Sequence, residues 1–208
     1  MLDWDHNAYY HRLLLRQLPR PCRRALDVGC GAGKFAARLA ARVEQVDAID
    51  RSPEMITLAE RSTPDNVDCV TADLLTDPLP SNDYDAIFSI CALHHMPLPD
   101  ALPILAKALR PGGMLAVIAL PRLDLRREWP AEIVAAIGHR VLGTAFLAAR
   151  SRGRNIWYAK DSSHDAMPVV MNPPLTTHDV AKLAGAALPG ARVRRLLFWR
   201  YLLLWRKS

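Results

Sequence analysis

The sequence has few cysteines and no long hydrophobic run, and both absences narrow the class of protein. Four cysteines stand among 208 residues, and no two of them form a CxxC pair. This spacing argues against a zinc knuckle or a disulfide framework and favours free thiols in a reducing compartment. The longest run without a charged residue, 86–99, is too short to cross a bilayer. The first twelve residues include two acids and no apolar stretch, so we expect no signal peptide and a soluble, cytoplasmic protein.

Positive charge is concentrated at the end of the chain. The formal net charge is +6, and residues 190–208 hold six basic side chains and no acidic one. Such a bias can attract an acidic substrate, a nucleic acid or an anionic membrane, or it can coat a solvated face. Aromatic residues lie between these arginines, an arrangement also found in proteins that bind RNA. The leucines of 191–207 need burial, however, and this favours a structural role for the segment.

Short apolar segments alternate with helical patterns over the first 120 residues. The predicted strands are 25–28, 46–49, 67–72, 84–90 and 114–120, and the predicted helices are 8–18, 34–43, one capped by Ser52, and 101–109. Nearly all-apolar strands separated by helices predict a parallel sheet covered on both faces. Because ligands bind such sheets beyond the carboxyl ends of the strands, the unusual residues at those ends are the candidate functional residues.

Three alternating glycines follow the first predicted strand. A tight turn that a ligand approaches closely requires glycine, because a Cβ would block the approach. A dinucleotide-binding G-x-G-x-x-G pattern would place its last glycine at position 34, where the sequence has Lys34. Asp50 ends the second strand and is suited to accept both hydroxyls of a ribose. Asp73 ends the third strand, either as a second ligand-binding acid or as a turn cap. Together these residues predict a nucleoside site that differs from an NAD site.

Five segments in a consistent order resemble the class I S-adenosylmethionine-dependent methyltransferases. They are ALDVGCGAGKFAARLA, DAIDRSPEM, VTADL, YDAIFSICALHHM and ALRPGG, and they span about residues 24–120. The resemblance implies an α/β fold with a doubly wound, mostly parallel seven-stranded sheet whose last strand is antiparallel, a Rossmann-like methyltransferase fold. It implies S-adenosylmethionine as the cofactor and methyl transfer to a small-molecule acceptor. It also implies that 191–208 forms the closing strands, so we do not expect a nucleic-acid partner.

The resemblance also suggests which residues hold the cofactor. It places the glycine loop beneath the methionine moiety and ribose, the acid after the second strand on the ribose, and the acid after the third strand on the adenine. The segment after the fourth strand would line the methyl-donor pocket. An N-terminal aromatic cluster would close over the cofactor or pack on the sheet; its members are Trp4, His6, Tyr9, Tyr10 and His11. The candidate cofactor-binding residues are therefore Tyr10, His11, Gly29, Cys30, Gly31, Asp50, Arg51, Met55, Asp73, Leu74, Cys91, Ala92 and His95.

No catalytic residue and no metal site is predicted. His94 and His95 are suited to act as a general base, because histidine titrates near neutral pH, or they pack the loop. Within a single domain covering 1–208, we expect an N-terminal helix or lid (1–23), a cofactor-binding core (24–120), a substrate-side insertion (121–190) and closing strands (191–208). The insertion contains predicted helices at 131–149 and 177–187. The first of these either walls the acceptor pocket or lies on a membrane surface.

Two other functions remain open at this stage. A nicotinamide-dependent oxidoreductase shares the fold, but its glycine pattern fails at Lys34. A protein that binds the cofactor or RNA without turnover is the other alternative. The motif Asn172-Pro173-Pro174 resembles one in amino-group methyltransferases, where it ends the fourth strand. Its displaced position here favours a rigid loop and argues against a nucleobase acceptor.

Overall fold

Seven strands form one continuous sheet in the computed structural model, which describes residues 6–124, 129, 138, 140–141, 144 and 173–208. The strands are β1 (Arg24–Val28), β2 (Gln45–Asp50), β3 (Val67–Thr71), β4 (Tyr84–Ile90), β5 (Leu109–Ala119), β6 (Arg192–Leu196) and β7 (Arg200–Arg206). Their order is β3-β2-β1-β4-β5-β7-β6. The pairs from β3 to β5 are parallel, whereas β7 runs antiparallel to both β5 and β6. The predicted seven-stranded sheet with an antiparallel last strand is confirmed.

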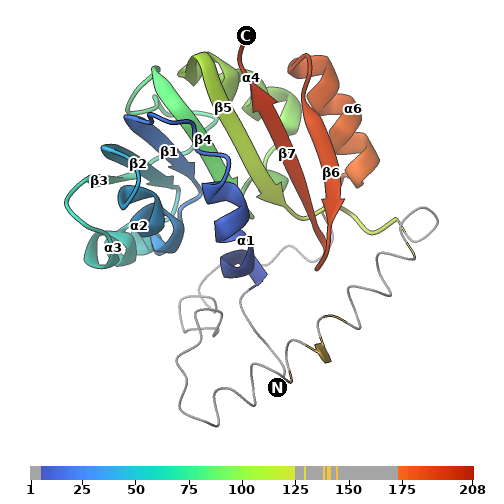
Figure 1. Cartoon of the computed structure of the whole chain (residues 1–208), viewed down its shortest axis with the longest axis horizontal. Helices are drawn as coiled ribbons and strands as arrows, with labels where there is room; N and C mark the ends of the chain where they lie inside the picture. The colour runs from blue at the N-terminus through green and yellow to red at the C-terminus, as the bar shows by residue number, and fades with distance from the viewer. Residues whose placement is uncertain (1–5, 125–128, 130–137, 139, 142–143, 145–172) are drawn as a thin grey trace.

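Helices cover both faces of this sheet (Figure 1). They are α1 (His6–Leu15), α2 (Lys34–Ala40), α3 (Pro53–Ser62), the 3-10 helix η1 (Leu93–His95), α4 (Leu98–Ala108) and α6 (Thr177–Ala187). One hydrophobic core joins the sheet to α1 and α2 through side chains such as Leu14, Phe35 and Phe88. A second core joins the other face to α4 and α6 through Leu102, Leu105 and Val180. The sheet is therefore buried on both sides, as its nearly all-apolar strands predict.

Two helices begin where local sequence signals place them. Ser52 is the N-cap of α3, and its Oγ accepts a hydrogen bond at 3.3 Å from the backbone N–H of Met55. Thr176 caps α6 in a reciprocal capping box with Asp179, and the helix covers 177–187 as predicted. Short polar side chains at these positions satisfy backbone N–H groups that have no partner within the helix.

Other boundaries differ from the sequence prediction. The helix predicted at 101–109 begins at Leu98, because Pro99 lies in its first turn, where a missing N–H is tolerated. The strand predicted at 114–120 begins at Leu109, so the Pro-Gly-Gly segment at 111–113 lies inside β5. A register irregularity where β4 pairs with β5 accommodates this segment. Helix α1 ends at Leu15 and α2 at Ala40, each three residues before its predicted end. The predicted helix at 131–149 lies, apart from isolated positions, outside the described residues.

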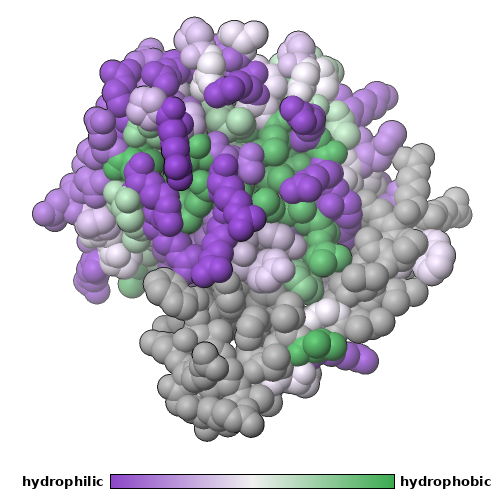
Figure 2. All heavy atoms as spheres, viewed as in Figure 1, coloured by the Kyte–Doolittle hydropathy of each residue, from purple (hydrophilic) through white to green (hydrophobic). Residues whose placement is uncertain are grey.

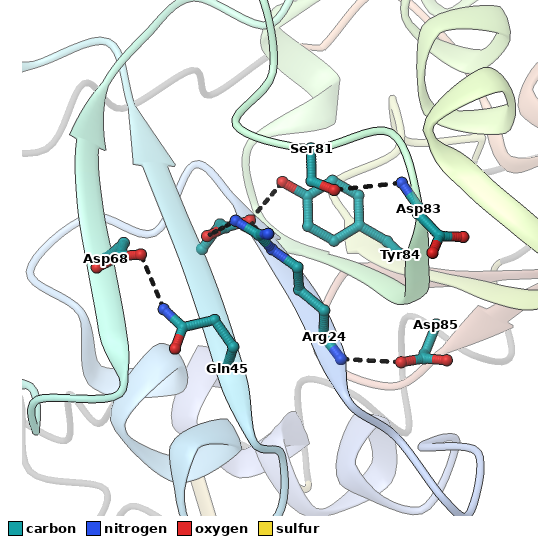
Figure 3. A network of polar contacts seen from close by, with 8 residues as sticks. Arg24, Gln45, Asp68, Ser81, Asp83, Tyr84 and Asp85 are labelled. Carbon is teal, nitrogen blue, oxygen red and sulfur yellow. Dashed lines mark hydrogen bonds and ion pairs between the residues drawn. The ribbon is translucent and has the colours of Figure 1, made fainter.

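A polar network closes the sheet at the amino ends of β1, β2 and β4 (Figure 3). The Arg24 guanidinium donates Nε and Nη2 to the two carboxylate oxygens of Asp47 at 2.8 and 3.0 Å. The Tyr84 hydroxyl donates to the same carboxylate at 2.6 Å. Beside it, the buried Asp85 forms an ion pair with Arg110. Because each of these charged groups has a partner of opposite charge, we interpret this edge as structural.

The face of the described part that Figure 2 shows carries both hydrophilic and hydrophobic side chains. Figure 2 shows hydrophilic side chains over most of the outer rim, with hydrophobic ones visible between them nearer the middle. Among the described helices, none is both long and apolar enough to cross a membrane. The arginines of the C-terminal segment are divided between β6 and β7, and its leucines Leu202 and Leu203 are fully buried. This confirms the prediction that the segment closes the sheet. Leu197, in the turn between the two strands, is 42% exposed, contrary to the expectation that the leucines of this segment are buried.

Candidate functional site

The glycine loop joins β1 to α2 at the carboxyl edge of the sheet. Gly29, Gly31 and Gly33 have φ values of 70°, 53° and 77°, in the left-handed region that side chains disfavour. The backbone N–H groups of Gly29 and Cys30 donate to the carbonyl of Ile49 in β2 at 2.8 and 3.0 Å. A Cβ on Gly29 would lie 2.2 Å from the Cβ of Ala92, after β4. The loop is thus held against the ends of both neighbouring strands.

Asp50 fixes the other side of this loop. Its Oδ2 accepts a hydrogen bond from the N–H of Gly31, and its Oδ1 accepts one from the N–H of Ser52, each at 2.9 Å. An ionised carboxylate has about four acceptor positions. One is used on each oxygen, so each retains capacity for one further donor. Binding of two adjacent ribose hydroxyls would require this capacity, one acceptor position on each oxygen.

The remaining residues after β2 and β3 surround this position in different ways. Arg51 is exposed, whereas Met55 and Leu74 are buried at 3% and 2% exposure. The Oδ1 of Asp73 accepts from the N–H of Leu75 at 2.9 Å, so this acid caps the turn after β3. Capping occupies only part of the carboxylate, and Asp73 remains partly exposed.

The segment after β4 contains the most unusual backbone of the site. Cys91 has a φ of 55°, and its N–H donates to the carbonyl of Ile118 at 2.7 Å. Its Sγ donates to Oδ1 of Asn7 in α1 at 3.0 Å. A left-handed conformation at a non-glycine residue costs about 1–3 kcal/mol and persists only where the surroundings impose it. The hydrogen bonds of Cys91 to β5 and α1 provide that constraint.

The two histidines of η1 stack, with ring centroids 4.1 Å apart. Burial, the neighbouring His95 and the charge of Arg200 lower the pKa of His94 to about 3. Burial and the charge of Arg51 lower the pKa of His95. Arg51, after β2, therefore lies close enough to His95 in η1 for its charge to act on the imidazole. With a pKa this low, His94 is neutral at physiological pH and a weak base.

The two candidates in α1 make packing contacts. The hydroxyl of Tyr10 donates to the carbonyl of Leu197, and burial raises the pKa of this hydroxyl. His11 is 4% exposed, and its ring lies 5.0 Å from that of Phe35 in α2. These contacts attach α1 to the β6–β7 turn and to α2. Trp4, which belongs to the same predicted cluster, lies outside the described residues.

Sequence reasoning assigned no role to Asp27, which the structure places in β1 two residues before the glycine loop. It is 1% exposed, and its Oδ2 has no hydrogen-bond partner among the described residues. Burial and the charge of Asp50 raise its pKa to about 7. An acid in an otherwise apolar strand was the available signal. Among the described residues, no group of three or more His, Cys, Asp or Glu side chains is placed to hold a metal ion.

The described elements define a Rossmann-like protein whose candidate functional residues lie at the carboxyl edge of its sheet. A family model described as "Methyltransferase domain" matches residues 25–113. The uncharacterized methyltransferase Rv0089 of Mycobacterium tuberculosis is 36% identical over 206 residues, covering 98% of this chain and 96% of that protein. The ubiquinone biosynthesis O-methyltransferase of Idiomarina loihiensis is 32% identical over 127 residues, covering 58% of this chain and 50% of that protein. The chain belongs to the class I S-adenosylmethionine-dependent methyltransferases, and its cofactor is S-adenosylmethionine.

Solved structures share the fold. The N-methyltransferase NodS from Bradyrhizobium japonicum, in complex with S-adenosyl-L-homocysteine, has a TM-score of 0.62 at 18% identity, covering 100% of this chain and 90% of that one. An S-adenosylmethionine-dependent methyltransferase from Mesorhizobium loti has a TM-score of 0.63 at 18% identity, covering 96% of this chain and 98% of that one. The oxidoreductase alternative is not favoured by these comparisons.

Proposed function

We propose that the protein transfers the methyl group of S-adenosylmethionine to a small-molecule acceptor, and that the cofactor lies across the carboxyl ends of β1, β2 and β4. The observation that carries this placement is the Asp50 carboxylate, which supports the loop through Gly31 and keeps acceptor capacity on both oxygens. On this proposal the entire chain is one methyltransferase domain, with 24–120 holding the cofactor and 121–190 on the acceptor side.

The proposal gives each part of the site a physical task. The left-handed glycines allow the backbone to approach the cofactor without a Cβ in between. Arg51 and Met55 lie against the adenine, and Asp73 and Leu74 approach it from the end of β3. Gly29, Cys30 and Gly31 lie beneath the ribose and methionine moiety. Cys91, Ala92 and His95 line the side from which the acceptor enters.

The charge of the site also suits this cofactor. S-adenosylmethionine supplies a methyl group activated by a sulfonium, and it carries a second positive charge on its amino group. Asp50 places negative charge beside the glycine loop, and the buried Asp27, whose pKa is about 7 and whose Oδ2 has no partner among the described residues, adds to this charge when it ionises. A nearby cation favours the ionised form of a carboxyl group, so binding is expected to lower the pKa of Asp27.

Catalysis in this proposal rests mainly on orientation. Holding the nucleophile, methyl carbon and sulfur in line contributes about 7–11 kcal/mol to such reactions. His94 is a poor general base, because the pKa of its conjugate acid is about 3. His95 is less buried and faces Arg51, so it remains the histidine to test. His95→Ala is expected to slow turnover more than it weakens cofactor binding if this side chain accepts a proton, and to leave turnover unchanged if it only packs.

Ligand-induced stabilisation tests the assignment of cofactor. S-adenosylhomocysteine is expected to raise the melting temperature of the protein, whereas NADH and a short RNA are expected to leave it unchanged. Stabilisation by NADH alone would overturn the proposal and restore the oxidoreductase alternative. Stabilisation by RNA alone would indicate a binding function for the basic C-terminal segment.

A further inference from the structure

We propose that Arg200 binds an anionic group, a carboxylate or a phosphate, on the methyl acceptor. This inference rests on the proposed function and extends it, because it names the chemical class of the acceptor. It assigns Arg200 as a binding residue on the acceptor side, a role that the sequence did not suggest among the six basic side chains of the C-terminal segment.

The position of Arg200 follows from the topology. Because β7 is antiparallel to β5, its first residue lies at the edge where β4 and β5 end, and Tyr201 pairs with Ala119. Figure 1 shows β7 beginning at the edge toward which the arrowheads of β5 and β6 point. The Nη2 of Arg200 donates to Oδ1 of Asn7 at 3.0 Å, and the same oxygen accepts from Sγ of Cys91 at 3.0 Å. One amide oxygen therefore links Arg200 to the segment after β4.

The charge of Arg200 has no carboxylate partner among the described residues. Its guanidinium donates to the carbonyls of Phe198 and Trp199 at 3.1 and 3.3 Å and to the Asn7 amide, all of them neutral acceptors. Its Nε is buried and has no hydrogen-bond partner there. Two other half-buried arginines do have a carboxylate partner, since Arg24 is paired with Asp47 and Arg110 with Asp85, although the Nε of Arg110 also has no hydrogen-bond partner among the described residues. A partly buried guanidinium without a counter-ion favours the binding of an anion.

The backbone beside Arg200 holds its guanidinium in place. Phe198 and Trp199 form the β6–β7 turn with φ values of 54° and 58°, in a conformation that glycine and asparagine normally adopt. Phe198 is 2% exposed, and its ring lies 5.5 Å from that of Tyr9. This packing keeps the strained turn in place, and the two turn carbonyls orient Nη1 of Arg200. The guanidinium is thereby preorganised before a ligand arrives.

The field of Arg200 also reaches the methyl-transfer side. Its charge contributes to lowering the pKa of His94, which follows β4 in η1. A guanidinium presents a planar set of donors that matches the geometry of a carboxylate or a phosphate, and it stays protonated at all physiological pH values. An acceptor whose anionic group bound here would have its remaining atoms beside Cys91 and the proposed position of the methyl group.

Matched pairs of small molecules test this inference. The probes are benzoate with benzamide, hexanoate with hexanamide, and phenyl phosphate with phenol, added at equal ionic strength to the full chain with and without S-adenosylhomocysteine. At least one anion is expected to raise the melting temperature more than its neutral counterpart. Carboxylate and phosphate pairs separate the two ligand chemistries. Arg200→Gln is expected to weaken the binding of the preferred anion by about tenfold or more.

Arg194→Gln is the matched control, because Arg194 is exposed on the neighbouring strand β6 and the change removes the same charge. It is expected to keep the preference for the anion. Arg200→Lys retains the charge but loses the planar set of donors, so its preference for the anion should lie between those of the wild type and Arg200→Gln. If Arg200→Gln does not fold, Arg200→Lys still tests the role of the guanidinium.

The inference is overturned if the wild-type protein prefers none of the three anions over its neutral counterpart. It is equally overturned if Arg200→Gln or Arg200→Lys keeps the full preference, in which case Arg200 only stabilises its turn. Failure of the proposed function gives a different result, since S-adenosylhomocysteine alone would then leave the melting temperature unchanged.

Discussion

The carboxylate of Asp50 accepts a hydrogen bond from the backbone N–H of Gly31 at 2.9 Å, joining the end of β2 to the loop after β1. The same side chain accepts from Ser52, the N-cap of α3. A single acid therefore positions the loop and the start of the next helix, and it still has acceptor capacity for a ligand. The site is organised before the cofactor binds, which lowers the entropic cost of binding.

Asp50→Asn tests this double role. The amide presents only one acceptor oxygen, so its NH₂ group must face an N–H donor or turn away. We expect S-adenosylhomocysteine to bind about 10–100-fold more weakly, because hydrogen bonds to charged groups contribute about 1.5–3 kcal/mol. Calorimetric titration measures the change. Asp68→Asn is the control, since Asp68 is exposed on β3 and contacts Gln45. The affinity of this variant for S-adenosylhomocysteine should equal that of the wild type. Equal affinity in Asp50→Asn would contradict the role assigned to Asp50.

Gly29→Ala tests the close approach of the loop to the segment after β4. The added Cβ would lie 2.2 Å from the Cβ of Ala92, and the residue has a φ of +70°. We expect a loss of about 1–3 kcal/mol in the free energy of unfolding, measured by chemical denaturation. Gly185→Ala in α6 is the control, because its Cβ meets nothing within 4 Å, and it should raise stability by about 0.5–1 kcal/mol. If Gly29→Ala unfolded with the same free energy as the wild type, the loop would not be held tightly against the segment after β4.

Asp27 is expected to make stability depend on pH in the direction opposite to most acids. Its pKa rises from 3.8 to about 7 on folding, because burial and the charge of Asp50 disfavour ionisation. Between these values the folded protein keeps a proton that the unfolded chain releases. The contribution of Asp27 to stability is therefore present below pH 4 and is lost as the pH rises to about 7.

Asp27→Asn removes this dependence. The stability of the wild type relative to the variant should fall by about 1.4 kcal/mol per pH unit across the middle of this range. Urea unfolding of both proteins at several pH values measures the difference. Parallel stability curves would indicate that Asp27 is already ionised in the folded protein at low pH.

The network at the amino edge is expected to contribute more to stability than an ion pair on the surface. Asp47 is 0% exposed and accepts from both Arg24 and Tyr84. Asp47→Ala leaves these donors without their partner and should cost about 3–5 kcal/mol in the free energy of unfolding. Arg122→Gln breaks an exposed pair with Asp179, 3.8 Å long, and should cost less than about 1 kcal/mol. If denaturation curves gave the two variants the same loss of stability, the buried network would contribute no more than the exposed ion pair.

The sequence was sufficient to predict the features that depend on local pattern. The glycines at 29, 31 and 33 form the predicted tight turn after β1, and Ser52 caps α3 as predicted, because backbone requirements determine these residues. The start of β5 was not predictable in this way. Its Pro-Gly-Gly segment is typical of a turn, and it lies within the strand because Leu109 before it and Met114 after it both pair with β4.

Residues that depend on long-range contacts were the ones that sequence reasoning missed. Asn7 contacts Arg200 across 193 residues, and no local pattern indicates that the two meet. Asp27 was visible as an acid in an apolar strand, but its raised pKa depends on its burial in the folded sheet and on Asp50 in a neighbouring strand. The contacts of the predicted cofactor-binding residues with the cofactor stay a prediction, because they depend on the position of the bound ligand.

A crystal structure of the protein with S-adenosylhomocysteine tests the central claim most directly. The account predicts the adenosine across the loop at 29–31, with both ribose hydroxyls within hydrogen-bond distance of the Asp50 oxygens. A cofactor bound at another edge of the sheet, or a ribose that leaves the Asp50 carboxylate without a ligand contact, would contradict it.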